Sequence, residues 1–405
     1  MKSVASAEDA ERLGAFNEAI HGDGTDAMTR ELILHHPHTR PEHWLYVEDD
    51  ASGQVVSSLC LIPWTWRYGS VTLRAGEMGI VGTLEPYRHR GLIRALDGRF
   101  KELLRDGGYH LSHIQGIPYY YRQFGYEYTL PLEVEWNLDL YRIPDAEHDT
   151  GWRFRQATLD DVPLLARLYD DAMADLDISA VRDADTWRFL LEHSPKTAMA
   201  SETWLLLEPG GQPVAYFIIE LGGFGVGLNV NGASRVRFDQ GQAILRQLKA
   251  LAVERGKPFV RLNLHDQSTL VQLAREWGAY SDGGYAWQIY LPDVAALLRQ
   301  IGPVLEQRLA HSIFAGLTDS VTINLYRAAF RMQFEGGQLK AVEALGRVET
   351  GGLHLPPTLF APLVLGYRSR EELHANYPDV SMWGYSGLLI DTLFPRMESF
   401  IHMIY

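Results

Sequence analysis

The chain has 405 residues, of which 46% are hydrophobic and 22% charged, and its 51 acidic residues against 37 basic ones give a net charge of −14. This length suggests several domains that each bury a core, and the acidic balance argues against nucleic acid as a partner. Cys60 is the only cysteine, which excludes an internal disulfide, and no apolar run is long enough to span a bilayer. We therefore expect a cytoplasmic protein with no membrane partner.

The first 84 residues predict two helices followed by strands. Ser6 or Ala7 would open the first helix, with Glu8, Asp9 and Glu11 complementing its dipole, and Pro37 would end the second helix. The helices are expected at about residues 7–20 and 27–36, and the strands at 44–48, 55–66, 71–73 and 76–84.

Two polar groups in the opening helices could bind ligands. Asp23, Asp26 and Glu31 could receive a cationic amine, although exposed charges at helix ends are the default interpretation. The run 35–38, His-His-Pro-His, could suggest a metal, but neighbouring helix residues point apart and Pro37 interrupts the run. We expect a surface helix end there and no metal site in the protein.

A basic turn lies between the strand that ends at Leu84 and an amphipathic helix that begins at Leu92. The first amides of a helix have no internal partners and carry partial positive charge, and Gly91 lets a large anion approach them closely. Full positive charges come from Arg88, Arg90 and Arg94. The turn therefore predicts a seat for a pyrophosphate at a helix N-terminus.

Two motifs carry a resemblance to a known family. The spacing Arg88-x-x-Gly91-x-Ile93 resembles the Arg/Gln-x-x-Gly-x-Gly/Ala loop of the GNAT acyl-CoA N-acyltransferases, although Ile93 departs from the last position. Residues 117–128, IPYYYRQFGYEY, resemble the aromatic motif that closes the acyl-CoA site in the Eis (enhanced intracellular survival) branch of that family. The resemblance covers the full chain but is specific in its motifs only at residues 79–128.

The resemblance implies acetyl-CoA as co-substrate and assigns residues to it. A strand edge would hydrogen-bond the pantetheine arm, and Gly116 and Ile117 would form the opposite wall, where the Eis branch has polar residues and this sequence departs from it. The amides of the turn that would hold the phosphates belong to His89, Arg90, Gly91, Leu92, Ile93 and Arg94, after Arg88, and the strand edge consists of Val81, Gly82 and Thr83.

The same resemblance supplies the catalytic groups. Tyr121 would be the general acid that protonates the departing thiolate, while Tyr119, Tyr120 and Tyr126 are interpreted as aromatic core residues. The general base would be the C-terminal carboxylate of Tyr405, since the apolar tail before it suits a buried terminus. No metal takes part.

The chain is expected to be an α+β protein of three domains. The resemblance implies a catalytic GNAT domain at 1–150, a degenerate GNAT-like domain at 151–290 and a sterol carrier protein-like domain at 291–405. The second domain lacks the phosphate turn, because Asp239 would repel a pyrophosphate. Family resemblance also implies a homo-oligomer, a hexamer.

The expected function is acetyl-CoA-dependent N-acetylation of a primary amine on a small molecule, aminoglycoside-like, polyamine or lysine-type, by direct attack on the thioester. Trp44, Trp64 and Trp66 could wall a substrate cavity, with core packing the expected role of at least two of them. One alternative is a lipid- or small-molecule-binding protein with a vestigial acyltransferase domain. Another is an acyltransferase that acts on protein lysines or on a peptide.

Overall fold

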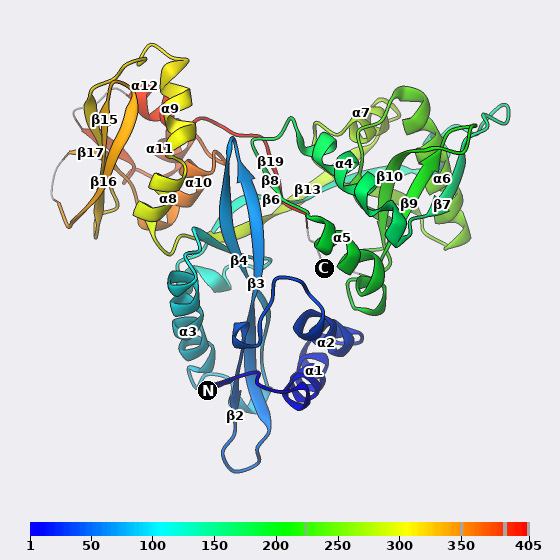
Figure 1. Ribbon diagram of the computed structural model, residues 1–405, viewed down its shortest axis with the longest axis horizontal. Coiled ribbons are helices and arrows are strands. Elements are labelled where there is room, and N and C mark those ends of the chain that lie inside the picture. The colour runs from blue at the N-terminus through cyan, green and yellow to red at the C-terminus, as the bar shows by residue number, and fades with distance from the viewer. Residues whose placement is uncertain (223–224, 349–350, 384–386, 403–405) are drawn as a thin grey trace.

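The computed structural model describes residues 1–222, 225–348, 351–383 and 387–402, which fold into three lobes. The first lobe lies at the bottom of Figure 1 in blue and cyan, the second in green at the upper right, and the third in yellow to red at the upper left. Each lobe packs helices on a sheet, so the predicted α+β class is confirmed. None of the described helices combines the length and apolar character that crossing a bilayer requires.

The first lobe begins as its sequence predicts. Ser6 caps α1, its hydroxyl accepting a hydrogen bond from the Asp9 amide at 3.1 Å. The strands predicted at 71–73 and 76–84 are one continuous strand, β4. The elements are β1 (Lys2–Ser3), α1 (Ala7–His21), α2 (Thr25–Leu34), β2 (Trp44–Glu48), β3 (Val55–Tyr68), β4 (Val71–Thr83), α3 (Leu92–Asp106), β5 (Leu111–Ile114) and β6 (Glu127–Asp139).

The second and third lobes complete the chain. The second contains β7 (Arg153–Gln156), α4 (Val162–Met173), β8 (Ile178–Ala180), α5 (Ala184–Glu192), β9 (Ser201–Leu207), β10 (Pro213–Glu220), β11 (Leu228–Ala233), α6 (Phe238–Glu254), β12 (Phe259–Asn263), α7 (Thr269–Glu276) and β13 (Tyr280–Tyr290). The third contains α8 (Val294–Gln300), α9 (Gly302–Ala310), β14 (Asp319–Asn324), β15 (Ala329–Glu335), β16 (Gln338–Gly346), β17 (Gly352–His354), α10 (Phe360–Val364), α11 (Arg370–Asn376), β18 (Ser381–Trp383), α12 (Gly387–Leu393) and β19 (Ser399–Phe400).

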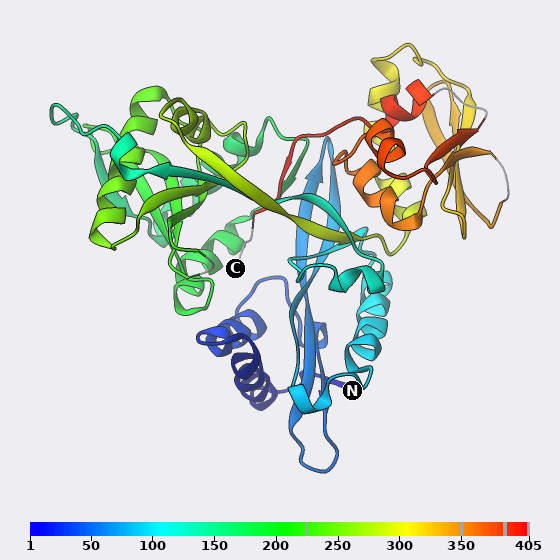
Figure 2. The same cartoon turned by 180° about the vertical axis from the view of Figure 1, so that it is seen from behind.

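One sheet runs through the first two lobes. Its order among the described strands is β1-β2-β3-β4-β5-β13-β6-β12-β11-β10-β9-β7, so β13 of the second lobe lies between β5 and β6 of the first. The antiparallel pair of β6 and β13 extends from Glu127 opposite Ile289 to Asn137 opposite Tyr280. Figure 2 shows this long pair crossing from one lobe to the other. Side chains of β13 therefore reach the first lobe.

The end of the chain returns to the first two lobes. The third lobe has its own sheet, in the order β16-β15-β14-β17-β18, and after α12 the chain leaves it. β19 then pairs in parallel with β8, Ser399 opposite Ile178, and β8 pairs with β3. A direct contact between lobes lies nearby, where the Tyr68 hydroxyl donates to the Val364 carbonyl at 2.7 Å.

A bulge opens the sheet in the first lobe. Ser58 of β3 lies opposite Gly82 and Cys60 lies opposite Gly79, so Ile80 and Val81 together face a single residue of β3. Ile80 has a φ of 47°, a strained conformation for a β-branched residue. β4 and β5 pair only from Ala75 to Glu77 and then part. The β4 backbone beyond Glu77 thus has an edge that β5 does not cover.

Candidate active site

The basic turn precedes α3 as predicted and is open to solvent. His89 and Gly91 both have positive φ, 64° and 76°, which turns the chain sharply into the helix. A Cβ added at Gly91 would meet no atom within 4 Å, so the space above the turn is clear. Arg88, His89 and Arg90 are exposed. An anion therefore has free access to the first amides of α3.

The arginines of the turn have few competing partners. Arg90 lies over the Tyr87 ring at 4.7 Å, and the Arg88 Nε lies 3.4 Å from the Thr83 carbonyl oxygen. Arg94 donates to the side-chain oxygen of Gln123 at 3.2 Å, which joins the turn to the aromatic motif. Across the described ranges, no carboxylate lies within ion-pair distance of these three guanidinium groups. Their charge remains available to a phosphate.

The predicted strand edge lies on β4 directly after the bulge. Val81 and Thr83 are half-buried, and Gly82 is buried. A Cβ at Gly82 would approach Ile20 of α1 at 3.1 Å, so this glycine accommodates a helix rather than the open edge. The strand edge, the turn and the aromatic motif all belong to the half of the lobe where β4 and β5 diverge.

Tyr121 is buried within the aromatic motif, in the short helical segment 120–124. Its ring packs against Tyr120, Phe124 and Tyr126, with centroids 5.0 to 6.3 Å apart. Burial raises the pKa of the Tyr121 phenol, so the phenol stays protonated. Among the residues that the structure describes, its hydroxyl has no hydrogen-bond partner. Tyr121 is therefore a neutral acid that is free to donate.

The other tyrosines of the motif are either hydrogen-bonded or exposed. Tyr126 is fully buried and shares a 2.8 Å hydrogen bond with the Ser112 hydroxyl, while Tyr119 and Tyr120 are exposed at the surface. The Tyr119 amide in turn donates to the Tyr128 hydroxyl at 3.2 Å. The interpretation as an aromatic core residue therefore holds for Tyr126 and is wrong for Tyr119 and Tyr120, which lie at the surface.

The wall at residues 116–117 depends on the second lobe, which sequence reasoning missed. The Gly116 carbonyl accepts hydrogen bonds from the Tyr285 hydroxyl at 2.7 Å and the Gln288 side-chain amide at 3.0 Å, both on β13. A Cβ at Gly116 would lie 2.3 Å from the Tyr121 ring, so glycine is required for the ring to seat. Ile117 is exposed. No local signal in the sequence pairs residue 116 with residues 285 and 288.

A buried polar pair on the opposite face of the sheet was also missed. Glu77 and His113 lie opposite each other at the last paired position of β4 and β5, with Oε2 and Nε2 3.8 Å apart. The His113 ring is enclosed by Trp64, Trp66 and Trp287 at 4.8 to 4.9 Å. Burial lowers the pKa of His113 to about 3, so the imidazole is neutral. The pair therefore places a carboxyl group beside an uncharged imidazole inside the lobe.

The chain end approaches this cluster as far as it is described. The Trp287 indole, whose ring contacts His113, donates to the Ile401 carbonyl at 3.2 Å. His402 stacks on Phe400 with ring centroids 6.1 Å apart. Tyr405, the predicted general base, lies outside the described residues.

The second lobe lacks a phosphate turn, as its sequence predicts. Asp239 lies in the first turn of α6, and Arg237 beside it contacts its carboxylate at 3.2 Å. This pairing offsets the charge of Arg237 at the start of α6. A pocket of about 730 Å³ lies between the starts of α6 and α7, with the exposed Phe238 on its rim.

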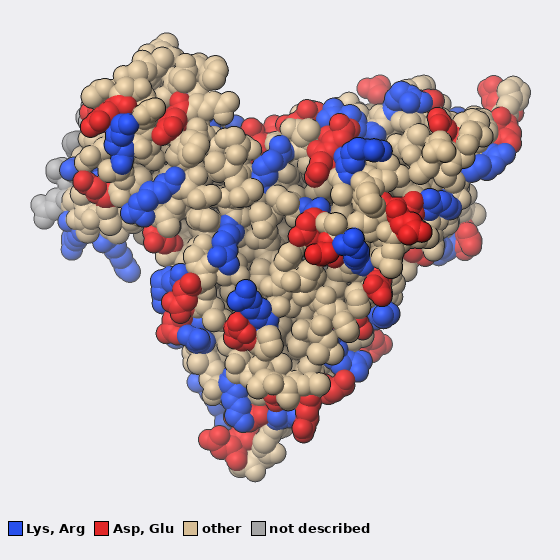
Figure 3. Space-filling model, viewed as in Figure 1, with Lys and Arg blue, Asp and Glu red and all other residues tan. Residues whose placement is uncertain are grey.

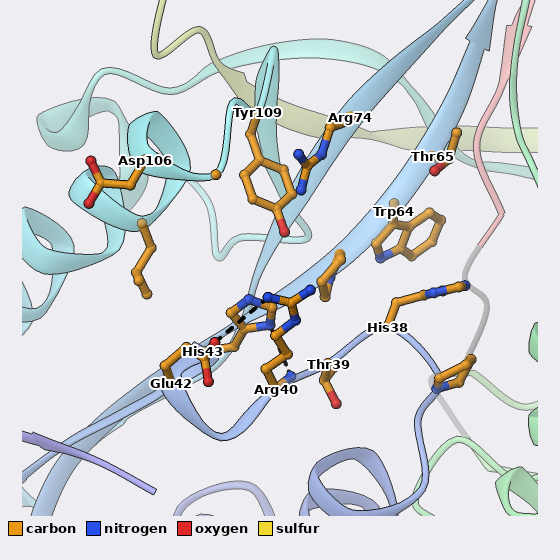
Figure 4. Close-up of a pocket in the computed structure, with 14 residues that line it drawn as sticks. His38, Thr39, Arg40, Glu42, His43, Trp64, Thr65, Arg74, Asp106 and Tyr109 are labelled. Carbon is orange, nitrogen blue, oxygen red and sulfur yellow. Dashed lines mark hydrogen bonds and ion pairs between the residues drawn. The ribbon is translucent and has the colours of Figure 1, made fainter.

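A pocket of about 470 Å³ lies at the other end of α3 from the phosphate turn. Figure 4 shows Arg40 and Arg74 beside the Tyr109 ring, with Trp64 on the other side of the pocket. Arg74 stacks over Tyr109 at 4.8 Å, and Arg40 has Glu42 at 4.0 Å. Glu42 and Asp106 line the pocket together with the two guanidinium groups, and so does Trp64, one of the tryptophans that could wall a substrate cavity. None of the described residues predicted for acyl-CoA binding or catalysis lines it.

The other polar candidates have ordinary partners. Asp26 pairs with Arg30 at 3.1 Å, and Asp23 is exposed. His36 is buried, and burial lowers its pKa to about 3, so the expectation that all of residues 35–38 lie at the surface is wrong for this histidine. Phe189 of the second lobe covers it edge-on at 5.1 Å. The Glu31 carboxylate contacts His193, which follows α5 in the second lobe.

Comparison with known proteins agrees with this geometry. The family described as Acetyltransferase (GNAT) domain matches residues 7–129. A search of curated proteins found no match.

Solved structures resemble the whole chain. A conserved Enterococcus faecalis V583 protein described as a probable N-acyltransferase superposes with a TM-score of 0.73 at 13% identity, covering 100% of this chain and 98% of that one. A GCN5-related N-acetyltransferase from Anabaena variabilis ATCC 29413 gives 0.71 at 16%, covering 98% of each chain. Eis1 from Mycobacterium abscessus gives 0.64 at 15%, covering 99% and 98%.

At these identities the solved structures establish the fold, and the family match establishes the class of the first lobe. The predicted tandem GNAT-like folds are confirmed, and the protein is an acyltransferase with its GNAT domain at residues 7–129.

Replacing Gly116 with Ala should disturb the seat of Tyr121, because the new methyl would overlap the phenol ring at 2.3 Å. A misplacement of about 1 Å costs on the order of 10²-fold in rate. We expect kcat for CoA release to fall by about that factor. Gly98→Ala is the matched control, since its methyl meets no atom within 4 Å. Equal kcat for both variants would contradict the proposed seat.

Proposed function

We propose that this protein transfers the acetyl group of acetyl-CoA to a primary amine on a small molecule. The observation that carries the proposal is the unpartnered phenol of Tyr121, buried beside the opening between β4 and β5 and linked through Gln123 and Arg94 to the basic turn. The diphosphate and the sulfur of acetyl-CoA lie far apart along the molecule. The basic turn would hold the diphosphate, and Tyr121 would lie near the sulfur.

The basic turn is the proposed seat for the pyrophosphate. Its amides, from His89 to Arg94, point into clear space above Gly91, and three guanidinium groups surround them. The uncovered edge of β4 after Ile80 would hydrogen-bond the amides of the pantetheine arm. The backbone at Gly116 would form the opposite wall, held in place by Tyr285 and Gln288.

The proposed chemistry is a direct displacement. The lone pair of a neutral amine attacks the thioester carbon, the C–N bond forms, and the C–S bond breaks. The departing thiolate takes a proton from the Tyr121 hydroxyl, and the amine loses a proton to a base. A thiol has an ordinary pKa of about 8.5, below that of a phenol, and burial raises the pKa of Tyr121 further. The transfer therefore has to accompany cleavage of the C–S bond, while the sulfur gains negative charge.

The base in this proposal is the carboxylate that Tyr405 carries as the last residue of the sequence. The support is the position of the residues before it, since the Ile401 carbonyl is bonded to Trp287, whose ring contacts His113. A terminal carboxylate with an ordinary pKa of about 3.5 is a weak base, so it would act by positioning the amine or through a water.

The acceptor is proposed to approach on the face that carries Glu77 and His113. His113 is neutral there, and the Glu77 carboxyl beside it could accept a hydrogen bond from an amine. Figure 3 shows acidic and basic residues interspersed over one face of the molecule, so the surface there does not select the acceptor by long-range charge. Aminoglycoside-like, polyamine and lysine-type acceptors all carry a primary amine. A CoA-release screen over such amines separates them.

Two finer assignments stay predictions from the resemblance. These are the sterol carrier protein-like character of residues 291–405 and the hexamer. Light scattering on the purified protein measures the assembly, and a monomeric mass would contradict the hexamer.

Acetyl-CoA should bind the purified protein, as titration calorimetry measures, and Arg88→Gln should weaken that binding about tenfold, because one charged hydrogen bond is worth roughly 1.5 kcal/mol or more. The affinity should also fall with added salt. Arg99→Gln is the control, since Arg99 lies on α3 and pairs with Glu102 at 2.7 Å. Absence of acetyl-CoA binding by the wild type would sink the proposed function.

Tyr121→Phe should lower kcat by about 10²- to 10⁴-fold without changing acetyl-CoA affinity, because it removes the proton donor alone. Since burial raises the pKa of Tyr121, the protonated and active form persists above the ordinary tyrosine pKa of about 10. The wild-type rate should therefore show no alkaline decline below about pH 10. Tyr120→Phe is the control within the motif, and full turnover by Tyr121→Phe would refute the assignment.

Adding Gly-Ser after Tyr405 should lower kcat strongly, because it moves the terminal carboxylate away from its position. Tyr405→Phe keeps that carboxylate and should stay active. The idea fails if the extended protein turns over at the wild-type rate in the CoA-release assay.

A further inference from the structure

The first and second lobes meet where α2 faces the end of α5, and this interface contains a set of metal-type ligands. Glu31, His35 and His193 each offer one ligand atom, and these atoms all lie within 4.8 Å of one another. Glu31 and His35 are four residues apart, so they project from the same face at the end of α2. The His35 amide donates to the Glu31 carbonyl at 2.9 Å, which continues the helical turn between them.

The third group comes from the other lobe and is held firmly. His193 follows α5, and its Nδ1 lies 2.6 Å from the Glu31 Oε2. The His193 ring lies between two parallel rings, Phe189 at 5.3 Å and His35 at 4.5 Å, each inclined by 17°. The Glu31 carboxylate accepts a hydrogen bond from His193 Nδ1 here, and a bound ion would displace the proton on that nitrogen.

We propose that Glu31, His35 and His193 bind a divalent transition-metal ion, Zn²⁺ or a close relative, that joins the first two lobes. Two imidazoles and a carboxylate suit Zn²⁺, which takes nitrogen and oxygen ligands at about 2.0–2.2 Å. Ligand atoms around a tetrahedral ion lie roughly 3.4 Å apart, between the 2.6 Å of the closest pair and the 4.8 Å limit of the set. His35 is exposed and stacks on His193 at 4.5 Å, so its ring has to turn out of that stack for both imidazoles to reach one ion.

Access and a fourth ligand are both available. The side chains of Glu31 and His193 are 20% and 17% exposed, so the ion can enter from solvent and a water can complete its shell. Bound there, the ion would hold α2 against α5. Because α2 packs through Met28 and Leu32 into the core that contains Trp64, the metal would fix the wall on the Glu77 side of the sheet.

This proposal rests on neither the acyl transfer nor the phosphate seat. The sequence alone predicts no metal here, because the histidine that completes the set lies 162 positions away from Glu31.

The test is titration of tag-free, chelator-stripped protein with Zn²⁺ by calorimetry, repeated with Co²⁺ to read its visible absorption. We expect one ion per chain, and His35→Ala should weaken binding by more than about tenfold, since even changes outside the ligand shell cost about 10- to 100-fold. His35 is exposed, so this variant should fold, and circular dichroism checks that it does.

His38→Ala is the matched control. It removes a neighbouring contact between the same lobes, His38 with Asp183 at 3.0 Å, but no proposed ligand. The control should keep the ion, and Zn²⁺ should raise the melting temperature of the wild type and the control but not of His35→Ala. Absence of Zn²⁺ binding by the wild type, or equal affinity in wild type and His35→Ala, would overturn the proposal. Neither result bears on acetyl-CoA binding, so the two proposals fail separately.

Discussion

The antiparallel pairing of β6 with β13 is the interaction on which the rest of the structure depends. It inserts a strand of the second lobe between β5 and β6 of the first, so one sheet serves both lobes. Three side chains of β13 then act in the first lobe. Tyr285 and Gln288 hold the Gly116 carbonyl, and Trp287 encloses His113 and binds the chain end. The candidate site therefore belongs to two lobes, although its motifs lie in one.

Burial shifts the pKa values of side chains on the two faces of that sheet in opposite directions. On the side of α3, burial raises the pKa of Tyr121 and preserves an uncharged proton donor. On the side of α1 and α2, burial lowers the pKa of His113 to about 3 and keeps that imidazole uncharged beside Glu77. A thioester and an amine that meet where β4 and β5 part would find a phenol on one side and the Glu77–His113 pair on the other.

The parts of the site that the sequence predicts are those encoded by neighbouring residues. The basic turn and Tyr121 can be identified because glycine, arginine and aromatic residues lie at fixed short spacings before and after helices. The Gly116 wall, the Glu77–His113 pair and the strand insertion depend on contacts between positions more than 100 residues apart, or on which strands become neighbours. The order of neighbouring residues does not predict such distant contacts or which strands become neighbours. The burial of His36 was missed for the same reason, since Phe189 of another lobe covers it.

The shared strand also constrains when the enzyme can form. β5 is made by residue 114, but its neighbour in the finished sheet, β13, is not complete until residue 290. A nascent chain emerging from the ribosome must therefore hold the edge of β5 open while about 170 further residues are synthesised. Such an exposed edge is a site where chaperones or other nascent chains can pair. The order of synthesis thus places the catalytic lobe among the last parts to close, although most of it is translated first.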